Sequence, residues 1–255
     1  RNASLRLAVG ALSKFTELPP QMSLKKIACL ASFVLGLTAM SLASPVTVTF
    51  TSGTSGLGGP TQGVYYYPYV ISVNGGSLNV ACDDYYDDIH LGESWQATVN
   101  TLDASGNVSG GIFAPGGAHA GVDANWQSDY KKAVWLFSQL TPPPPVDNSV
   151  NAAINFAIWD LFDHSAATLN AGNPSSNTSS AYWLAQANAA DLSNFDFSPY
   201  VIFTPVAGTW PSKYSIGPQE LIGEVPEPAS LALMLGGLLC LGGLAWKQRG
   251  SRAGA

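Results

Sequence analysis

The chain has 255 residues, of which 11 are Lys or Arg and 17 are Asp or Glu, so its formal net charge is −6. The imbalance is concentrated between residues 44 and 224, where three Lys stand against 15 acidic residues, a balance of −12. An acidic surface of this kind repels the phosphates of nucleic acid, so we expect no nucleic-acid partner. About 180 residues are enough for a single domain with a hydrophobic core.

Two segments precede this domain. Residues 1–21 show no clear pattern, and we expect them to be an upstream extension. Residues 22–43 combine Lys25-Lys26, a short apolar run and the small residues Ser41-Leu42-Ala43. This order is typical of a secretory signal peptide, and we expect cleavage after Ala43. An uncleaved N-terminal membrane anchor is the alternative.

The first half of the domain is predicted to be β-structure. Its residues alternate with a period of two and are rich in β-branched and aromatic side chains. The predicted strands cover residues 46–50, 64–73, 77–82 and 95–102. Between the second and third strands, Asn74-Gly75 is a strong signal for a two-residue hairpin turn.

From residue 125 onward apolar residues recur at helical spacing. The predicted helices cover residues 125–140, 147–162 and 181–192, and strands at 200–204 and 213–216 are expected to complete the domain. The second helix is apolar almost all round, so it belongs in the interior. The sequence therefore predicts an α+β domain over residues 44–224, with a β-rich N-terminal half and three helices in its C-terminal half.

Four carboxylates follow the third predicted strand within six residues: Asp83, Asp84, Asp87 and Asp88. Carboxylate oxygens are the ligands that Ca²⁺ prefers, so these residues are weak candidates for a calcium site. The segment lacks the spacing and the Gly of an EF-hand loop. A solvated acidic turn is the plainer interpretation, and we assign no metal site.

No constellation of catalytic residues stands out. His90, His119 and His164 are widely separated and lack the spacing of a metal motif. Ser is plentiful, but no Gly-x-Ser-x-Gly segment of the hydrolase type occurs. We therefore expect a protein that is not an enzyme and that carries no cofactor.

Cys82 is the only Cys between residues 44 and 224, so no disulfide can form within the domain. It ends a predicted strand, and a predicted helix later carries Asn155-Phe156-Ala157-Ile158-Trp159. This order resembles the thioester domains of bacterial surface adhesins, in which a Cys after a strand bonds to a Gln on a helix. Cys82 matches that Cys, and Asn155 stands in the Gln position.

The resemblance implies a covalent adhesin, because an amine on a partner can attack the acyl group of a thioester. Asn is one methylene shorter than Gln, so the same backbone placement would leave its carbonyl short of the sulfur. We therefore expect Asn155 to be an ordinary polar residue and Cys82 to be a free thiol. The working thioester remains the alternative.

An uncharged apolar run covers residues 229–246. Its 18 residues would make a helix of about 27 Å, close to the thickness of a bilayer core. Pro226 and Pro228 precede it, and the basic residues Lys247, Arg249 and Arg252 follow it. The pattern predicts a C-terminal transmembrane helix with its basic end in the cytoplasm.

The segment Val225-Pro226-Glu227-Pro228, the apolar run and the terminal basic residues together resemble the PEP-CTERM sorting signal of bacterial envelope proteins. That resemblance implies export and transient anchoring of residues 225–255 in the inner membrane. It also implies recognition by a membrane enzyme called exosortase. The domain itself would then lie outside the cytoplasm.

These features predict an exported cell-envelope or extracellular-matrix protein with a non-catalytic role in adhesion or matrix formation. The expected partners are an exosortase-like enzyme, the membrane and extracellular polysaccharide. Tyr65, Tyr66, Tyr67 and Tyr69 could line a glycan-binding face, although plain packing within a sheet explains them as well. The alternatives are a thioester-type adhesin, a Ca²⁺-dependent or glycan-binding module, and a secreted hydrolase.

Overall fold

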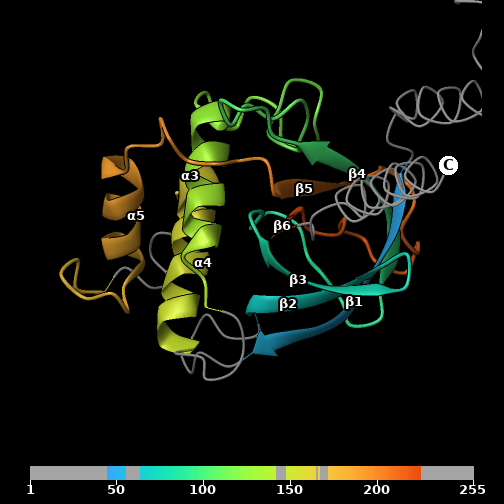
Figure 1. Ribbon diagram of the computed structural model, residues 1–255. Coiled ribbons are helices and arrows are strands. Elements are labelled where there is room, and N and C mark those ends of the chain that lie inside the picture. Colours follow the sequence, from blue (N-terminus) through green and yellow to red (C-terminus); the bar gives the residue numbers. More distant parts are fainter. Residues whose placement is uncertain (1–44, 56–63, 142–147, 165, 167–171, 225–255) are drawn as a thin grey trace, which may run out of the picture. The chain divides into compact units, whose positions relative to one another are not determined.

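The structure is a computed structural model, and it describes residues 45–55, 64–141, 148–164, 166 and 172–224 (Figure 1). Its strands form one closed antiparallel barrel in the order β1-β2-β3-β6-β5-β4. The strands are β1 (Val46–Ser55), β2 (Tyr65–Val73), β3 (Gly76–Cys82), β4 (Ser94–Thr101), β5 (Tyr200–Pro205) and β6 (Leu221–Glu224).

The hairpin between β2 and β3 joins two strands that are neighbours in the sequence. Asn74 has φ of 50° and Gly75 has φ of 83°, the two positive values that a two-residue turn of the I′ type requires. The turn sets the register, which pairs Val73 with Gly76 and runs on to Tyr69 opposite Val80.

Alternation along the strands divides their side chains between two cores. Val48, Phe50, Ile71, Trp95 and Phe203 belong to the core inside the barrel. On the opposite face of the sheet, Ala81, Ile202 and Ile222 belong to a second core with the helices. Because residues paired across antiparallel strands share one face, the pairings of Ala81 and of Ile202 with Ile222 place all three on the helical side.

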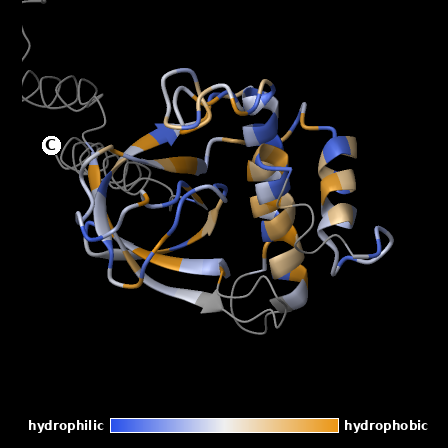
Figure 2. Cartoon of the chain, turned by 180° about the vertical axis from the view of Figure 1, so that it is seen from behind, coloured by the Kyte–Doolittle hydropathy of each residue, from blue (hydrophilic) through white to orange (hydrophobic). Residues whose placement is uncertain are grey.

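The helices are α3 (Trp126–Ser138), α4 (Asn148–Phe162) and α5 (Ser180–Ala189). Helix α4 contacts α3 and α5 as well as strands β2 and β3, and α3 contacts β6. Apolar residues lie along α4 and along the facing strands (orange in Figure 2). Residues 151–162 of α4 are all buried, as the apolar residues on almost every side of the helix predict.

The predicted fold class was wrong. The strands close into one six-stranded antiparallel barrel, whereas the sequence predicted an α+β domain without such closure. Residues 213–216 form no strand, and β6 lies at residues 221–224 instead. A four-residue strand is too short to show a clear alternation, which is why the pattern missed it.

The predicted transmembrane helix also requires correction. Among the residues that the structure describes, no helix is long and apolar enough to cross a membrane. The apolar run at 229–246 lies outside the described residues. The same holds for the extension at 1–21, the signal peptide at 22–43, the sorting motif at 225–228 and the basic residues Lys247, Arg249 and Arg252.

Candidate functional site

Three segments that are distant in the sequence meet where β3 ends. The loop from Asp83 to Glu93 leaves β3, the loop at 110–121 precedes α3, and Gln219 and Glu220 lead into β6. The amide N–H of Asp83 donates to the carbonyl of Glu220 at 3.3 Å. The side chain of Gln219 donates to the carbonyl of Asp84 at 2.9 Å. These bonds hold the acidic loop against the strand that closes the barrel.

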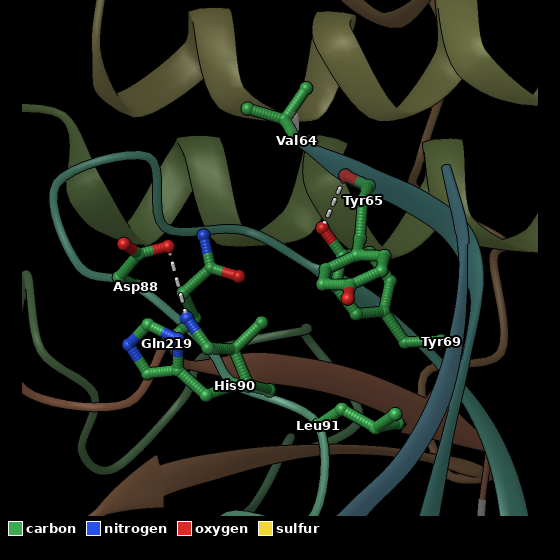
Figure 3. A pocket seen from close by; sticks show the side chains of 8 residues that line it. Val64, Tyr65, Tyr69, Asp88, His90, Leu91 and Gln219 are labelled. Carbon is green, nitrogen blue, oxygen red and sulfur yellow. Dashed lines mark hydrogen bonds between the residues drawn. The ribbon is translucent and has the colours of Figure 1, made fainter. Parts of the chain in front are cut away.

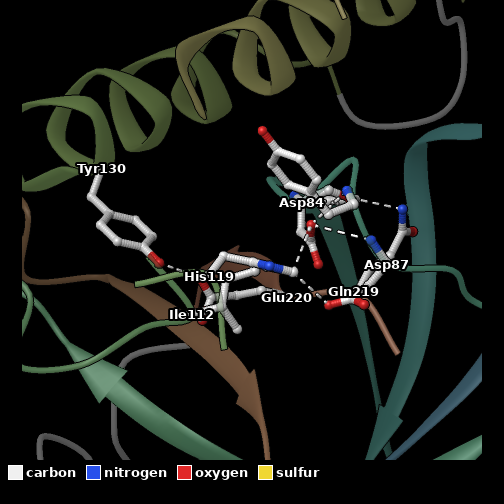
Figure 4. Close-up of polar contacts among 9 residues, drawn as sticks. Asp84, Asp87, Ile112, His119, Tyr130, Gln219 and Glu220 are labelled. Carbon is white, nitrogen blue, oxygen red and sulfur yellow. Dashed lines mark hydrogen bonds and ion pairs between the residues drawn. The ribbon is translucent and has the colours of Figure 1, made fainter. Parts of the chain in front are cut away.

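His119 lies beside two of the four carboxylates in the acidic loop (Figure 4). Its Nε2 is 3.0 Å from Oδ2 of Asp87 and 3.9 Å from Oδ1 of Asp84. The hydrogen bond to Asp87 and the nearby carboxylate charges raise the pKa of His119, although its partial burial opposes this. The group holds one imidazole and two carboxylates close enough to share a cation.

Glu220 is buried next to this group and accepts three hydrogen bonds. The hydroxyls of Tyr130 and Thr204 donate to its two oxygens, and the amide N–H of Ile112 donates at 3.0 Å. Burial raises the pKa of Glu220 to about 7, and the three donors moderate the rise. Glu220 is therefore partly protonated near neutral pH.

Asp83 and Asp84 are both fully buried. Burial is the main cause that raises the pKa of each carboxyl well above its usual range, with the charge of Glu220 adding to the rise at Asp83 and that of Asp87 at Asp84. Neither oxygen of Asp83 has a hydrogen-bond partner among the described residues, and the same holds for Oδ2 of Asp84. Groups of this kind are costly to bury unless a proton or a cation accompanies them.

The structure also brings Cys82 and Asn155 into contact. The side-chain amide of Asn155 donates to the carbonyl of Cys82 at 2.9 Å, and its oxygen accepts the N–H of Tyr67 at 2.9 Å. Continuing the register of β2 and β3 from Tyr69 and Val80 would place Tyr67 opposite Cys82. The Asn155 amide therefore takes the place of a backbone-to-backbone bond where the two strands separate.

The sulfur of Cys82 is fully buried and held within its own loop. Its thiol donates to the carbonyl of Asp84 at 2.8 Å, and Sγ accepts the N–H of Asp84 at 3.3 Å. Burial raises the pKa of the thiol well above its usual range, and the charges of Asp84 and Asp83 raise it further. The thiolate, which is the nucleophilic form, is therefore scarce at neutral pH.

The chain matches no protein-family model, no curated protein and no solved structure. The resemblances to PEP-CTERM tails and to thioester domains therefore gain no support from known proteins. The chemistry of the site is therefore inferred from its own residues and distances.

A second feature near the same loop is an open pocket of about 250 Å³ (Figure 3). Its lining residues are Val64, Tyr65, Tyr69, Asp88, Ile89, His90, Leu91 and Gln219. The His90 ring stacks on Tyr214, with 4.2 Å between ring centroids. Asp88 and Leu91 are exposed, and Tyr65 is half-buried. The pocket thus combines an aromatic ring, an aliphatic side chain and polar groups.

The four Asp residues are close together in the sequence but lie in different places in the structure. Asp84 and Asp87 meet His119, Asp83 lies in the interior near Glu220, and Asp88 is exposed at the pocket. Of the four Tyr residues, Tyr66, Tyr67 and Tyr69 are buried in the cores. These three Tyr residues therefore serve packing rather than a glycan-binding face.

Sequence reasoning missed four contributors to this site: His119, Tyr130, Thr204 and Glu220. Tyr130 lies on α3 and Thr204 on β5, whereas His119 and Glu220 lie in two separate loops, so no spacing along the chain joins the four. One local signal was present, since Glu220 directly precedes the apolar residues Leu221 and Ile222. A carboxylate next to a buried strand is uncommon enough to mark a special position.

Proposed function

We propose that residues 45–224 form an exported, non-catalytic binding module that attaches to extracellular polysaccharide. The observation that carries this proposal is the open pocket lined by Tyr65, Asp88, His90 and Leu91. Sugars have apolar ring faces and hydroxyl groups around the ring edge, so sugar-binding sites combine aromatic side chains with carboxylates and amides. The pocket offers both kinds of group from one small area.

The size and exposure of the pocket support this class of ligand. Its volume of about 250 Å³ is just below the 300–1,000 Å³ that is usual for enclosed small-molecule sites. Such a pocket suits one or two sugar units at the end or along the side of a polymer. The acidic balance of the domain favours neutral over anionic polysaccharides, because like charges repel.

Retention of the purified chain on a panel of immobilised neutral and acidic polysaccharides tests this function. We expect retention on at least one neutral polymer, and a loss of about tenfold in affinity in Asp88→Ala, which removes an exposed hydrogen-bonding group (about 1.4 kcal/mol). Tyr65→Ala should weaken binding similarly. A matched control is Tyr182→Ala on α5, because this Tyr does not line the pocket.

Tyr65 also packs edge-on against Phe50, with 5.2 Å between ring centroids. Its substitution can therefore lower stability, so the exposed Asp88 variant is the cleaner measurement. Binding that is equal in the Asp88 and control variants, or no binding to any polymer of the panel, would contradict the proposal.

Export is tested separately by mass spectrometry of the protein recovered from cell fractions. We expect a mature N-terminus after Ala43 and recovery outside the cytoplasm. The same spectrum reports whether Cys82 and Asn155 keep all their atoms, because a thioester would make the chain lighter by one ammonia. We expect no such loss, since hydrogen bonds to backbone groups hold both ends of the Asn155 amide.

A further inference from the structure

The loops hold Asp84, Asp87 and His119 in fixed positions. The N–H of His119 donates to the carbonyl of Ile112 at 2.8 Å. Oδ1 of Asp84 accepts the N–H groups of Tyr86 at 2.8 Å and Asp87 at 3.3 Å. These bonds fix the directions of one ring and one carboxylate before any ligand arrives, which lowers the entropic cost of binding.

Gly117 allows two parts of the loop that carries His119 to approach each other closely. A Cβ atom at Gly117 would lie 2.3 Å from the carbonyl oxygens of Gly111 and Ile112, so no other residue fits there without movement of the backbone. The 110–121 loop is therefore packed against itself. Its His119 ring also lies 5.0 Å from the ring of Tyr86, measured between centroids.

The distances among the three side chains suit a metal ion. One ligand atom from each residue can be chosen so that all lie within 4.8 Å of one another. Bonds of about 2.0–2.2 Å from Zn²⁺ to nitrogen and oxygen at tetrahedral angles separate the ligand atoms by about 3.3–3.5 Å. The observed 3.0 Å and 3.9 Å between His119 and the two carboxylates bracket that value.

An independent observation points to a cation. Oδ2 of Asp84 is buried and lacks a hydrogen-bond partner among the described residues, although its carboxylate faces His119. Both oxygens of Asp83, the preceding residue, are in the same condition. Within the described part of the chain, the ion pairs that reach Asp84 and Asp87 both come from His119, and none comes from Lys or Arg. The negative charge here is thus poorly compensated by the protein.

We propose that Asp84, Asp87 and His119 bind one divalent transition-metal ion, of which Zn²⁺ is the representative. An imidazole ligand favours such ions, whereas Ca²⁺ takes six to eight oxygen ligands. The side chains of His119 and Asp87 are 20% and 18% exposed, so the remaining coordination position opens towards solvent. The inference stands apart from polysaccharide binding, because none of the three ligands lines the pocket.

Zinc titration of the full-length chain tests the site, after treatment with a chelator and removal of that chelator. Calorimetry should report one Zn²⁺ per chain at this site, and Co²⁺ in its place should give the visible absorption of a tetrahedral ion. His119→Gln and Asp87→Asn should each weaken Zn²⁺ binding by at least tenfold. The matched control is His164→Gln, because that ring is 88% exposed and pairs with Asp160 instead.

Both ligand variants replace partly exposed side chains, so they are expected to fold, and circular dichroism verifies this. Zn²⁺ affinity that is unchanged in both folded variants would overturn the proposal, as would an absence of Zn²⁺ binding to the original chain. Equal competition by Ca²⁺ at the same concentration would overturn the choice of a transition metal. Polysaccharide retention measured on the same proteins keeps the two proposals separate.

Discussion

Asn155 joins three elements through one side chain. It lies on α4 and bonds to Tyr67 of β2 and to Cys82 of β3. The sequence predicted an ordinary polar residue. In the structure it links a helix to two strands, and no secondary-structure propensity indicates such a link. The signal was its occurrence as a polar residue in the apolar middle of α4, between Ile154 and Phe156.

Asn155→Ala should destabilise the fold strongly. It leaves a buried N–H and a buried carbonyl without partners, each at a cost of about 1–3 kcal/mol. We expect the free energy of unfolding to fall by about 2–4 kcal/mol in total, measured by denaturant titration. Asn188→Ala replaces an exposed Asn on α5 and should change it by less than about 0.5 kcal/mol. A similar small change at Asn155 would show that the bridge is dispensable.

Glu220 makes the stability depend on pH in an uncommon direction. Its pKa in the folded protein is about 7, above its ordinary value of 4.5, so the folded chain binds more protons than the unfolded chain between these values. Stability therefore falls as pH rises from about 4.5 to about 7. The raised pKa values of Asp83 and Asp84 act in the same direction.

Melting temperatures measured in the presence of a chelator should accordingly be higher at pH 5 than at pH 8. Glu220→Gln removes the charge, so it should reduce this dependence on pH. Its amide nitrogen cannot accept a hydrogen bond, so the stability at pH 5 should fall by about 1–3 kcal/mol. Glu224→Gln, at an exposed position of β6, should leave the dependence as it is. A pH profile that is the same in Glu220→Gln and the original chain would contradict this account of the buried carboxyl.

At the scale of elements, local patterns located helices and the first hairpin but not the closing strand. The three helices begin and end within a few residues of their predicted limits because each carries many apolar residues at helical spacing. Strand β6 has four residues, and one of its two partners, β3, lies far away in the sequence. Pairing of that kind is decided by the tertiary structure rather than by any short segment.

The Asn74-Gly75 turn supports a test at this scale. Gly75 has φ of 83°, which side chains disfavour, although there is open space around it. Gly75→Ala should lower the free energy of unfolding by about 1–2 kcal/mol through backbone strain alone. Gly76→Ala at the next position, where φ is not positive, should have a smaller effect. Equal effects would mean that the turn tolerates another conformation.

For the whole molecule, the shared core predicts one cooperative unit. Ile222 is fully buried in the core that joins the barrel to the helices. Ile222→Ala should cost about 2–4 kcal/mol. The helical signal in circular dichroism and the protection of the barrel backbone amides from hydrogen exchange should be lost at one lowered temperature.

Ile216→Ala is the matched control, since that Ile is 48% exposed and its truncation should cost little. Two separate transitions in Ile222→Ala would show that the helices and the barrel fold independently.

The position of β6 in the barrel also governs the order in which a growing chain can fold. Strand β3 pairs with β6 roughly 140 residues later, as in the pair Val80 and Gly223. Until residue 224 has been made, β3 and β5 each keep an unpaired edge, and such edges invite pairing with other chains. Nascent chains that stop short of β6 are therefore the species that need the protection of a chaperone, and the pairing of β6 with β3 and β5 removes that need.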